Sequence, residues 1–153
     1  MSNPPTLLSK ELSAEMEQTS HQIIGCAIEV HRNLGPGLLE SIYQQALVYE
    51  LRQADLSVQQ QVEIKIPYKN TTLGGQRLDI LVEHSIVLEL KSIETILPVH
   101  RAQLLSYLRA GGFPLGLLIN FNRTQLKEGL VRVFNERVLK NAQSPSRSSR
   151  PSR

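Results

Sequence analysis

The chain has 153 residues, of which 41% are hydrophobic and 20% charged, a composition that predicts one globular domain with its own core. No apolar run approaches the roughly 20 residues that cross a bilayer, and the N-terminus lacks a secretory signal pattern, so we expect a cytoplasmic protein without membrane contact. The formal charge of +3 matches the three arginines of the last ten residues, and the remaining body, with 14 basic and 14 acidic groups, does not indicate a broad basic surface.

Two helices are predicted in the first third of the chain. Apolar residues recur at helical spacing over Thr19–Leu34. The sequence GPG at 35–37 ends this pattern, and a second helical pattern covers Leu39–Ala54. The single cysteine, Cys26, cannot form an internal disulfide, so we interpret it as a small buried side chain of the first helix.

Three strands are predicted next. The period changes to two over Val58–Tyr68, with polar residues on one face. The apolar residues assigned to the other face are Val58, Val62, Ile64, Ile66 and Tyr68. Residues 69–75, KNTTLGG, are typical of a turn, and Arg77–Glu83 and Ile86–Ser92 then form a hairpin with a very short loop.

The last third is predicted to add a helix and one or two strands. The helix Val99–Ala110 ends at two glycines, and residues 114–121, PLGLLINF, are typical of a buried strand. Leu130–Phe134 is too short to separate a strand from the start of a short helix, so both interpretations stay open. The order predicts an α/β fold of the α+β type, with a central mixed sheet flanked by helices.

The expected domain covers residues 19–140 and follows an N-terminal extension, 1–18. Residues 141–153 are rich in Ser, Pro and Arg and too polar to bury surface, which predicts a disordered tail. Weak, salt-sensitive phosphate contacts by its arginines are the alternative interpretation of the tail.

The predicted hairpin carries three charges in otherwise apolar strands. They are Asp79, Glu89 and Lys91, within RLDILVEHSIVLELKS. Asp79 can face Glu89 only if residues 83–85 form a three-residue loop. Lys91 then shares the face of the two acids, and the leucines on either side of Glu89 take the opposite face.

Charges in a buried sheet cost free energy unless they are paired or bind a metal. Two carboxylates suit a hard cation such as Mg²⁺, and a lysine beside them can position a water or neutralise a phosphate, so the set suits phosphodiester hydrolysis. The alternative is a structural cluster in which Lys91 pairs with both acids. The spacing alone favours the structural cluster.

Several separated motifs resemble one known family. GLLESIY, Gly37 to Tyr43, resembles the signature of the GxxExxY proteins. The stretches IIGCAIEVHRNLGPGLLE and ELKSIETILPVHRAQLLSYL resemble the same family, so the resemblance covers Ile23 to Phe121. This family is assigned to the PD-(D/E)XK nuclease-like superfamily. The resemblance therefore implies a restriction-endonuclease-like core with the order helix, three strands, helix, strand.

The resemblance also implies a set of catalytic residues. Asp79 resembles the strand aspartate of the superfamily, and Glu89 with Lys91 resembles its acid-x-lysine element. Glu40, one helix earlier, resembles the additional helical acid. All four are expected in the catalytic site, with Asp79 and Glu89 as the metal ligands. Leu78 stands where the superfamily has a proline before the aspartate, a position that supplies no ligand.

A further motif lies in the third predicted helix. Gln103 and Tyr107 are four residues apart, and therefore on one helix face, and they resemble the glutamine-x-x-x-tyrosine element of recombination-type nucleases. With Tyr43, the last residue of the signature, they are expected to support the site or contact the substrate.

The function implied by the resemblance is that of a nuclease that uses Mg²⁺, with Mn²⁺ as the alternative metal, to cleave DNA, with RNA as the alternative substrate. The competing hypothesis is a non-catalytic module that binds nucleic acid or a protein partner, because the neutral body and seven Phe and Tyr residues indicate no basic groove or stacking platform. A second copy of the chain or another partner would then complete the surface. Basic residues around the acids, namely Arg77, Arg101 and Arg109, would favour cleavage.

Overall fold

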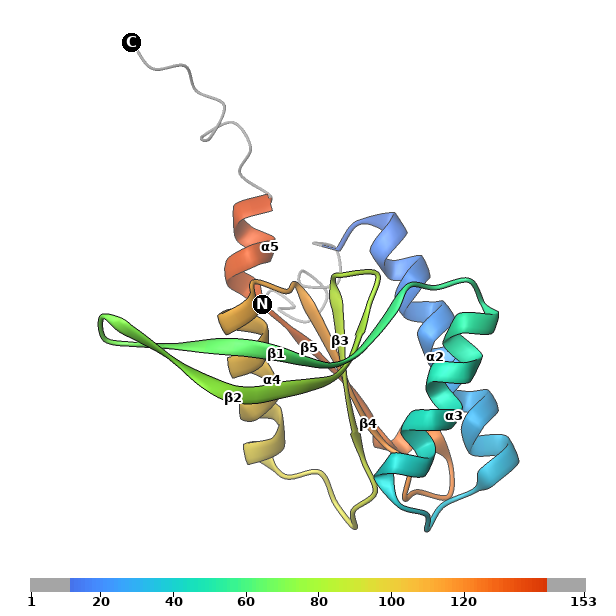
Figure 1. The fold of residues 1–153 in the computed structure, drawn as a ribbon. Coiled ribbons are helices and arrows are strands. Elements are labelled where there is room, and N and C mark those ends of the chain that lie inside the picture. Colours follow the sequence, from blue (N-terminus) through green and yellow to red (C-terminus); the bar gives the residue numbers. More distant parts are fainter. Residues whose placement is uncertain (1–11, 143–153) are drawn as a thin grey trace, which may run out of the picture.

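A five-stranded sheet lies between helices on its two faces (Figure 1). The computed structural model describes residues 12–142, so residues 1–11 of the predicted extension and the tail from residue 143 lie outside the described residues. The strands are β1 (Val58–Tyr68), β2 (Thr71–Val82), β3 (Ile86–Lys91), β4 (Leu115–Asn120) and β5 (Leu130–Phe134). The helices are α2 (Ala14–Leu34), α3 (Glu40–Gln53), α4 (Pro98–Gly111) and α5 (Glu136–Ala142), with a 3₁₀ turn, η1 (Leu126–Gly129). Neighbouring strands follow chain order, and β3 and β4 are parallel while the other pairs are antiparallel, so the sheet is mixed as predicted.

Helix α2 begins five residues earlier than the sequence pattern predicted. Ser13 is its N-cap, because the Ser13 hydroxyl accepts a hydrogen bond from the Met16 backbone N–H at 3.1 Å. Glu15 and Glu17 lie in the first turn, where negative charge is favourable near the positive end of the helix dipole. The apolar pattern missed this turn because most of its residues are polar. Residues 14–18, assigned by prediction to the extension, are therefore helical.

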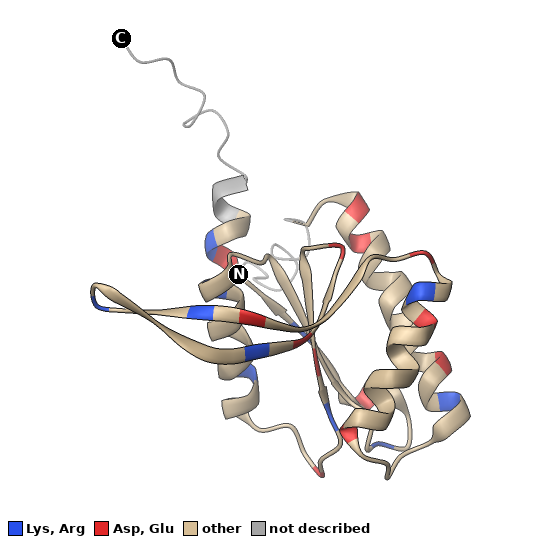
Figure 2. Ribbon diagram, viewed as in Figure 1, with Lys and Arg blue, Asp and Glu red and all other residues tan. Residues whose placement is uncertain are grey.

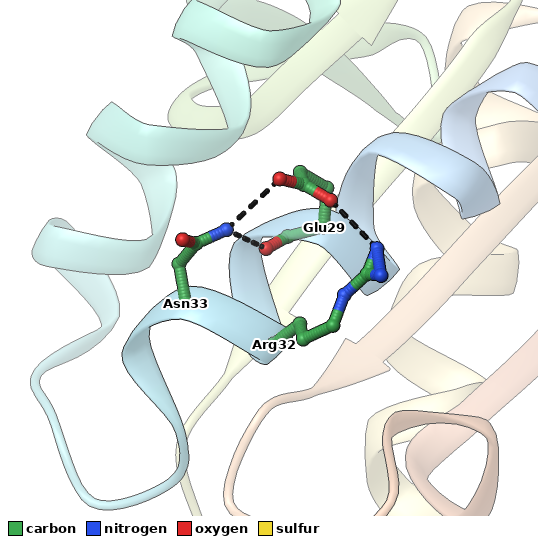
Figure 3. A network of polar contacts seen from close by, with 3 residues as sticks. All are labelled: Glu29, Arg32 and Asn33. Carbon is green, nitrogen blue, oxygen red and sulfur yellow. Dashed lines mark hydrogen bonds and ion pairs between the residues drawn. The ribbon is translucent and has the colours of Figure 1, made fainter.

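The other end of α2 carries a polar network on its surface (Figure 3). Arg32 Nη2 lies 2.8 Å from Glu29 Oε1, and Asn33 Nδ2 donates to the Glu29 backbone carbonyl at 2.8 Å and to Oε2 at 3.0 Å. The charged side chains are exposed, so the ion pair contributes only tenths of a kcal/mol, about 0.3–0.5. The network lies directly before Gly35, whose φ of 70° ends the helix.

Strands β1 and β2 form a long ribbon that projects from the rest of the sheet (Figure 1). Only residues 69–70 connect them, so the prediction of a turn over residues 69–75 is wrong. Thr71–Gly75 belong to β2, and the pairing register shifts where two glycines lie opposite Lys65. Gly75 there has a φ of 98°, which a β-bulge accommodates. Pairing with a distant segment thus overrides the local turn preference of these residues.

Two hydrophobic clusters fill the two sides of the sheet, one under α2 and α3 and the other under α4. The ribbon strands change sides between them, because Val58 and Ile80 pack in the first cluster while Val62 and Leu78 pack in the second. Gln61, between the two parts of β1, has a left-handed φ of 52°, which breaks the alternation of side chains. The prediction that Val58 shares one face with the later apolar residues of β1 is therefore wrong.

Helix α4 packs closely against β4 at Gly116. A Cβ at this position would lie 3.0 Å from side-chain atoms of Leu104, so glycine permits the approach. Asn135 fixes the other end of the helix, since its Nδ2 donates to the backbone carbonyls of Leu108 at 3.1 Å and Phe113 at 3.0 Å. The helix is thereby held across the sheet face that carries the charged residues described below.

The ambiguous segment near the C-terminus contains both predicted alternatives. Leu130–Phe134 forms β5, antiparallel to β4, and the short helix α5 follows it. Within residues 12–142, none of the helices has the length and apolar character needed to cross a membrane.

Candidate active site

Strands β2 and β3 have the register that places Asp79 opposite Glu89. Val82 pairs with Ile86 across the loop 83–85, which confirms the predicted three-residue connection. Counting back from this pair along both strands makes Asp79 the counterpart of Glu89. A slip of one residue would turn one of the two acids to the other face of the sheet.

The backbone ladder ends before it reaches the two acids, and their carboxylates accept hydrogen bonds in its place. Leu90 N–H donates to Asp79 Oδ2 at 3.0 Å, and Asp79 N–H donates to Glu89 Oε2 at 3.3 Å. In the described part of the chain, no hydrogen bond uses the second oxygen of either carboxylate. Each acid is thus fixed through one oxygen and has the other available for a further group.

Burial raises the pKa of both acids, and the charge of a neighbouring carboxylate raises each pKa further. Glu89 is 7% exposed, and burial followed by the neighbouring charge of Asp79 raises the pKa of Glu89 to about 8. Burial and then the charge of Glu40 raise the pKa of Asp79, while the hydrogen bond from Leu90 opposes the rise. The pair would be stabilised by a proton or by a cation bound between the two groups.

Lys91 lies near the acids without pairing with them. Its charge lowers the pKa of both Asp79 and Glu89, although these effects are smaller than that of burial. None of the four ion pairs found among residues 12–142 involves Lys91. The alternative of a structural cluster with direct lysine pairing therefore does not describe this site. Leu88 and Leu90 pack in the cluster under α2 and α3, on the opposite face as predicted.

Glu40 approaches the site from the first turn of α3. Its Oε2 accepts a hydrogen bond from Ser92 N–H at 3.2 Å, and the Ser92 hydroxyl donates to the Leu38 carbonyl at 2.6 Å. These contacts fasten the start of α3 to the end of β3. The charge of Glu40 raises the pKa of both Asp79 and Glu89, so the helical acid lies within electrostatic reach of both.

Gln103 and Tyr107 reach the same face of the sheet from α4. Tyr107 is buried in the cluster beneath this helix. Burial raises the pKa of its phenol, the charges of Glu89 and then Asp79 raise it further, and the neighbouring Gln103 side chain opposes the rise. Tyr107 therefore lies within electrostatic reach of the two sheet acids, and Gln103 lies one helical turn before it on the exposed side of α4.

Tyr43 is the predicted site residue that lies elsewhere. Its side chain is fully buried and stacks on Phe121, with ring centroids 4.4 Å apart. The Tyr43 hydroxyl donates to the Gly35 carbonyl and accepts from Leu38 N–H, which holds the turn between α2 and α3. A buried side chain cannot contact substrate in this conformation, so the substrate-binding role predicted for Tyr43 is wrong and only a supporting role remains.

Two residues that the sequence reasoning missed position the site. Gln44 Nε2 donates to the Asp79 backbone carbonyl at 3.4 Å, and its place four residues after Glu40 on the same helix face could have indicated this. Asn120 is fully buried; its Oδ1 accepts from Ile93 N–H at 3.1 Å, and its Nδ2 donates to the Ile93 carbonyl at 2.9 Å. Asn120 pairs with Lys91 across β3 and β4, so it secures the chain just after the lysine.

The donor set fits a hard cation of the magnesium type. Among residues 12–142, the His, Cys, Asp and Glu side chains form no group of three or more that could hold a metal. Asp79 and Glu89 lie side by side and offer two carboxylates. Mg²⁺ commonly takes only one or two protein carboxylates and keeps several waters. The second oxygen of each acid is available for such binding.

Comparison with known proteins gave one family match. A family model described as the PD-(D/E)XK nuclease superfamily matches residues 17–133. No curated protein matches the chain. Among solved structures, the chain described as "Crystal structure of SSO0001" has 20% sequence identity and a TM-score of 0.46. That alignment covers 71% of this chain and 58% of the other, so this chain spans less than two thirds of the length of that relative.

Proposed function

The chain belongs to the PD-(D/E)XK nuclease superfamily, and we propose that it is a metal-dependent nuclease that hydrolyses phosphodiester bonds in DNA, with RNA as the alternative substrate. The observation that supports this most directly is the adjacent carboxylates of Asp79, half-buried, and Glu89, buried, at the end of the β2–β3 ladder. Lys91 lies near them but is unpaired among the described residues. Two adjacent acids removed from water are unfavourable in their charged forms unless a cation binds there, and without the cation Glu89 holds its proton more tightly.

Asp79 and Glu89 would hold Mg²⁺, or Mn²⁺ in its place. When bound, the metal supplies positive charge that neutralises the phosphate and lowers the pKa of a water. Lys91 has the charge needed to orient the attacking water or to stabilise negative charge that develops on the scissile phosphate. Glu40 would support the ligands by fixing the end of β3 through Ser92, and its charge would strengthen cation binding.

Gln103 and Tyr107 would act from the helix that covers the site. The charges of both acids raise the pKa of the Tyr107 phenol, which supports a role in positioning Lys91 or a substrate phosphate. Gln103 is exposed and could contact the substrate directly. Each role can be separated by removing the phenolic hydroxyl or the amide alone.

Membership in the GxxExxY family is the finer assignment that we propose. The signature GLLESIY supports it, and its two named residues have complementary places. Glu40 reaches toward the carboxylates, whereas Tyr43 holds the preceding turn from inside the core. The signature would then act as one unit that docks the start of α3 beside the metal ligands.

The first test is cleavage of labelled single-stranded DNA, double-stranded DNA and RNA with Mg²⁺, Mn²⁺ or EDTA. The variants Glu89→Gln and Lys91→Ala should lose activity by about 100-fold or more, because each removes a charge that acts at the reacting phosphate. Exposed residues of the same types provide matched controls, namely Glu94→Gln and Lys127→Ala.

The outcome separates catalysis from binding alone. Metal-dependent cleavage that both site variants abolish and both controls retain supports the proposal. If folded native protein cleaves none of the three substrates and binds no divalent metal, the nuclease proposal is wrong and the non-catalytic module takes its place.

A further inference from the structure

A surface depression runs along α4 away from the candidate active site. Its first part, about 460 Å³, is lined by Val99, His100, Ala102, Gln103 and Ser106. Its second part, about 260 Å³, is lined by Ser106, Arg109 and Ala110 of α4, by Ile66 and Pro67 of β1, and by Arg137 of α5. Ser106 lines both parts, so they adjoin along α4, and the second part lies between this helix, β1 of the projecting ribbon and α5.

The floor of this depression is formed by small side chains of the helix. Ala102, Ser106 and Ala110 follow one another at intervals of four and so lie along one helix face. Ile66 and Pro67 of the ribbon form an apolar wall beside the second part. Two adjoining parts of about 460 and 260 Å³, one with an apolar wall, suit the bases and sugars of a single strand better than a whole duplex.

The far end of the depression is positively charged. Arg109 and Arg137 both line it, both are exposed, and neither belongs to the ion pairs found in the described part of the chain. Glu136 is the neighbouring acid along α5, so the local balance is two guanidinium groups to one carboxylate. Lysines and arginines also occur along the β1–β2 ribbon and α4 (Figure 2). Planar guanidinium groups are well suited to bind phosphate.

The near end of the depression lies on the same helix as a residue that packs beside the candidate active site. Gln103 lines the depression, and Tyr107, one helical turn later, packs in the cluster that holds Leu78 and Val87, sheet residues within two positions of the acids in β2 and β3. The six residues from Gln103 to Arg109 correspond to about 9 Å of helix, which matches about three phosphates of a stacked strand at about 3.4 Å each.

We propose that this depression binds one single strand of nucleic acid that leaves the candidate site along α4, with its phosphates on Arg109 and Arg137. The inference rests on the proposed nuclease function, because it takes the strand to start at the catalytic carboxylates. It specifies the substrate class: nucleic acids with an unpaired segment of about three nucleotides on one side of the scissile bond bind better than blunt duplexes.

Binding in EDTA tests the inference without any cleavage. Fluorescence anisotropy with labelled oligothymidylate and with a blunt DNA duplex would compare native protein with the double variant Arg109→Ala/Arg137→Ala. We expect about tenfold or greater weakening for the single strand, and a slope of log affinity against log salt that is smaller by about 1.4, or 0.7 for each lost phosphate contact. Arg52→Ala, an exposed arginine in the last turn of α3, is the matched control and should bind as the native protein does.

A second variant separates occupancy of the depression from general attraction of phosphate. Ser106→Trp leaves the charge unchanged and places a large side chain on an exposed floor position shared by both parts. It should weaken single-strand binding about tenfold while circular dichroism shows an intact fold. Duplex binding equal to that of the single strand, or affinities unchanged in both variants, would overturn the inference.

The two proposals fail in different ways. If the protein cleaves with metal but both depression variants, Arg109→Ala/Arg137→Ala and Ser106→Trp, bind the single strand as the native protein does, the nuclease proposal stands and the single-strand site is wrong. A protein that binds the single strand through the depression but cleaves nothing keeps the binding site and loses the catalytic proposal.

Discussion

Replacing Glu89 with glutamine should stabilise the metal-free protein near neutral pH. The pKa of Glu89 is raised to about 8 in the fold, mainly by burial and then by Asp79, from 4.5 as its ordinary value. An acid with a raised pKa holds its proton in the folded state after the unfolded chain has lost it. The contribution of protonated Glu89 to the free energy of unfolding is therefore fully present below about pH 4.5, and it is lost as the pH rises toward about 8.

The gain in stability expected for Glu89→Gln follows from the difference between the two pKa values of Glu89. Each pH unit between the two pKa values lowers the free energy of unfolding by about 1.4 kcal/mol, so the native protein loses about 3 kcal/mol between pH 4.5 and pH 7. A glutamine cannot ionise, and its side-chain carbonyl can still accept the hydrogen bond from Asp79 N–H. At pH 7 the variant should be more stable by up to about 3 kcal/mol, which is about 6–12 °C in Tm for a chain of this size.

Urea unfolding in EDTA at pH 5, 6, 7 and 8, followed by circular dichroism, measures this difference directly. The gap between Glu89→Gln and native protein should widen as the pH rises, whereas the exposed control Glu94→Gln should show no such trend. Added Mg²⁺ should then raise the Tm of the native protein more than that of Glu89→Gln, because the metal stabilises only a fold that binds it. A variant that is less stable at pH 7, or a gap that does not change with pH, would refute the account of a repulsive buried pair.

Three further predictions concern residues around the acids. Tyr43→Phe keeps the stacked ring but loses the hydroxyl that holds the turn, so urea unfolding should show a loss of about 1–2 kcal/mol in the free energy of unfolding. The folded variant should still cleave, and a variant of native stability that no longer cleaves would contradict this prediction. Asn120→Ala leaves the backbone N–H and carbonyl of Ile93 without these partners, so urea unfolding should show a loss of about 2–3 kcal/mol in the free energy of unfolding. A loss of less than about 0.5 kcal/mol would disprove the positioning role of Asn120. Glu40→Gln can still accept a hydrogen bond from Ser92 N–H but carries no charge, so calorimetric titration should show about tenfold weaker Mn²⁺ binding at an unchanged Tm. Equal Mn²⁺ affinity would show that Glu40 does not act at the site.

Local patterns were enough to predict most elements of the fold and the pairing of the charged hairpin. Helical and two-residue periodicities depend on residues close in sequence, and each predicted helix and strand forms. The prediction that Asp79 lies directly opposite Glu89 required Val82 to pair with Ile86, and β2 and β3 have that register. Burial on two sides of the sheet makes any other register unfavourable.

The composition of the site depended on contacts between distant segments. Tyr43 belongs to a motif that suggested a place in the site. The Tyr43 ring instead lies in the core, stacked on Phe121, which comes 78 residues later in the chain. Asn120 gives no local signal, because its role depends on the chain after Lys91 lying beside it.

The amino-acid sequence by itself determined the elements, the hairpin register and the identity of the charged residues, since these follow from spacing along the chain. Only the tertiary structure decided which side chains surround the acids and which face each part of the ribbon covers. The left-handed conformation of Gln61 turns β1 from one hydrophobic cluster to the other, and no residue pattern within that strand indicates it. Packing of three helices on two faces of the sheet supplies the free energy that holds such a backbone conformation in place.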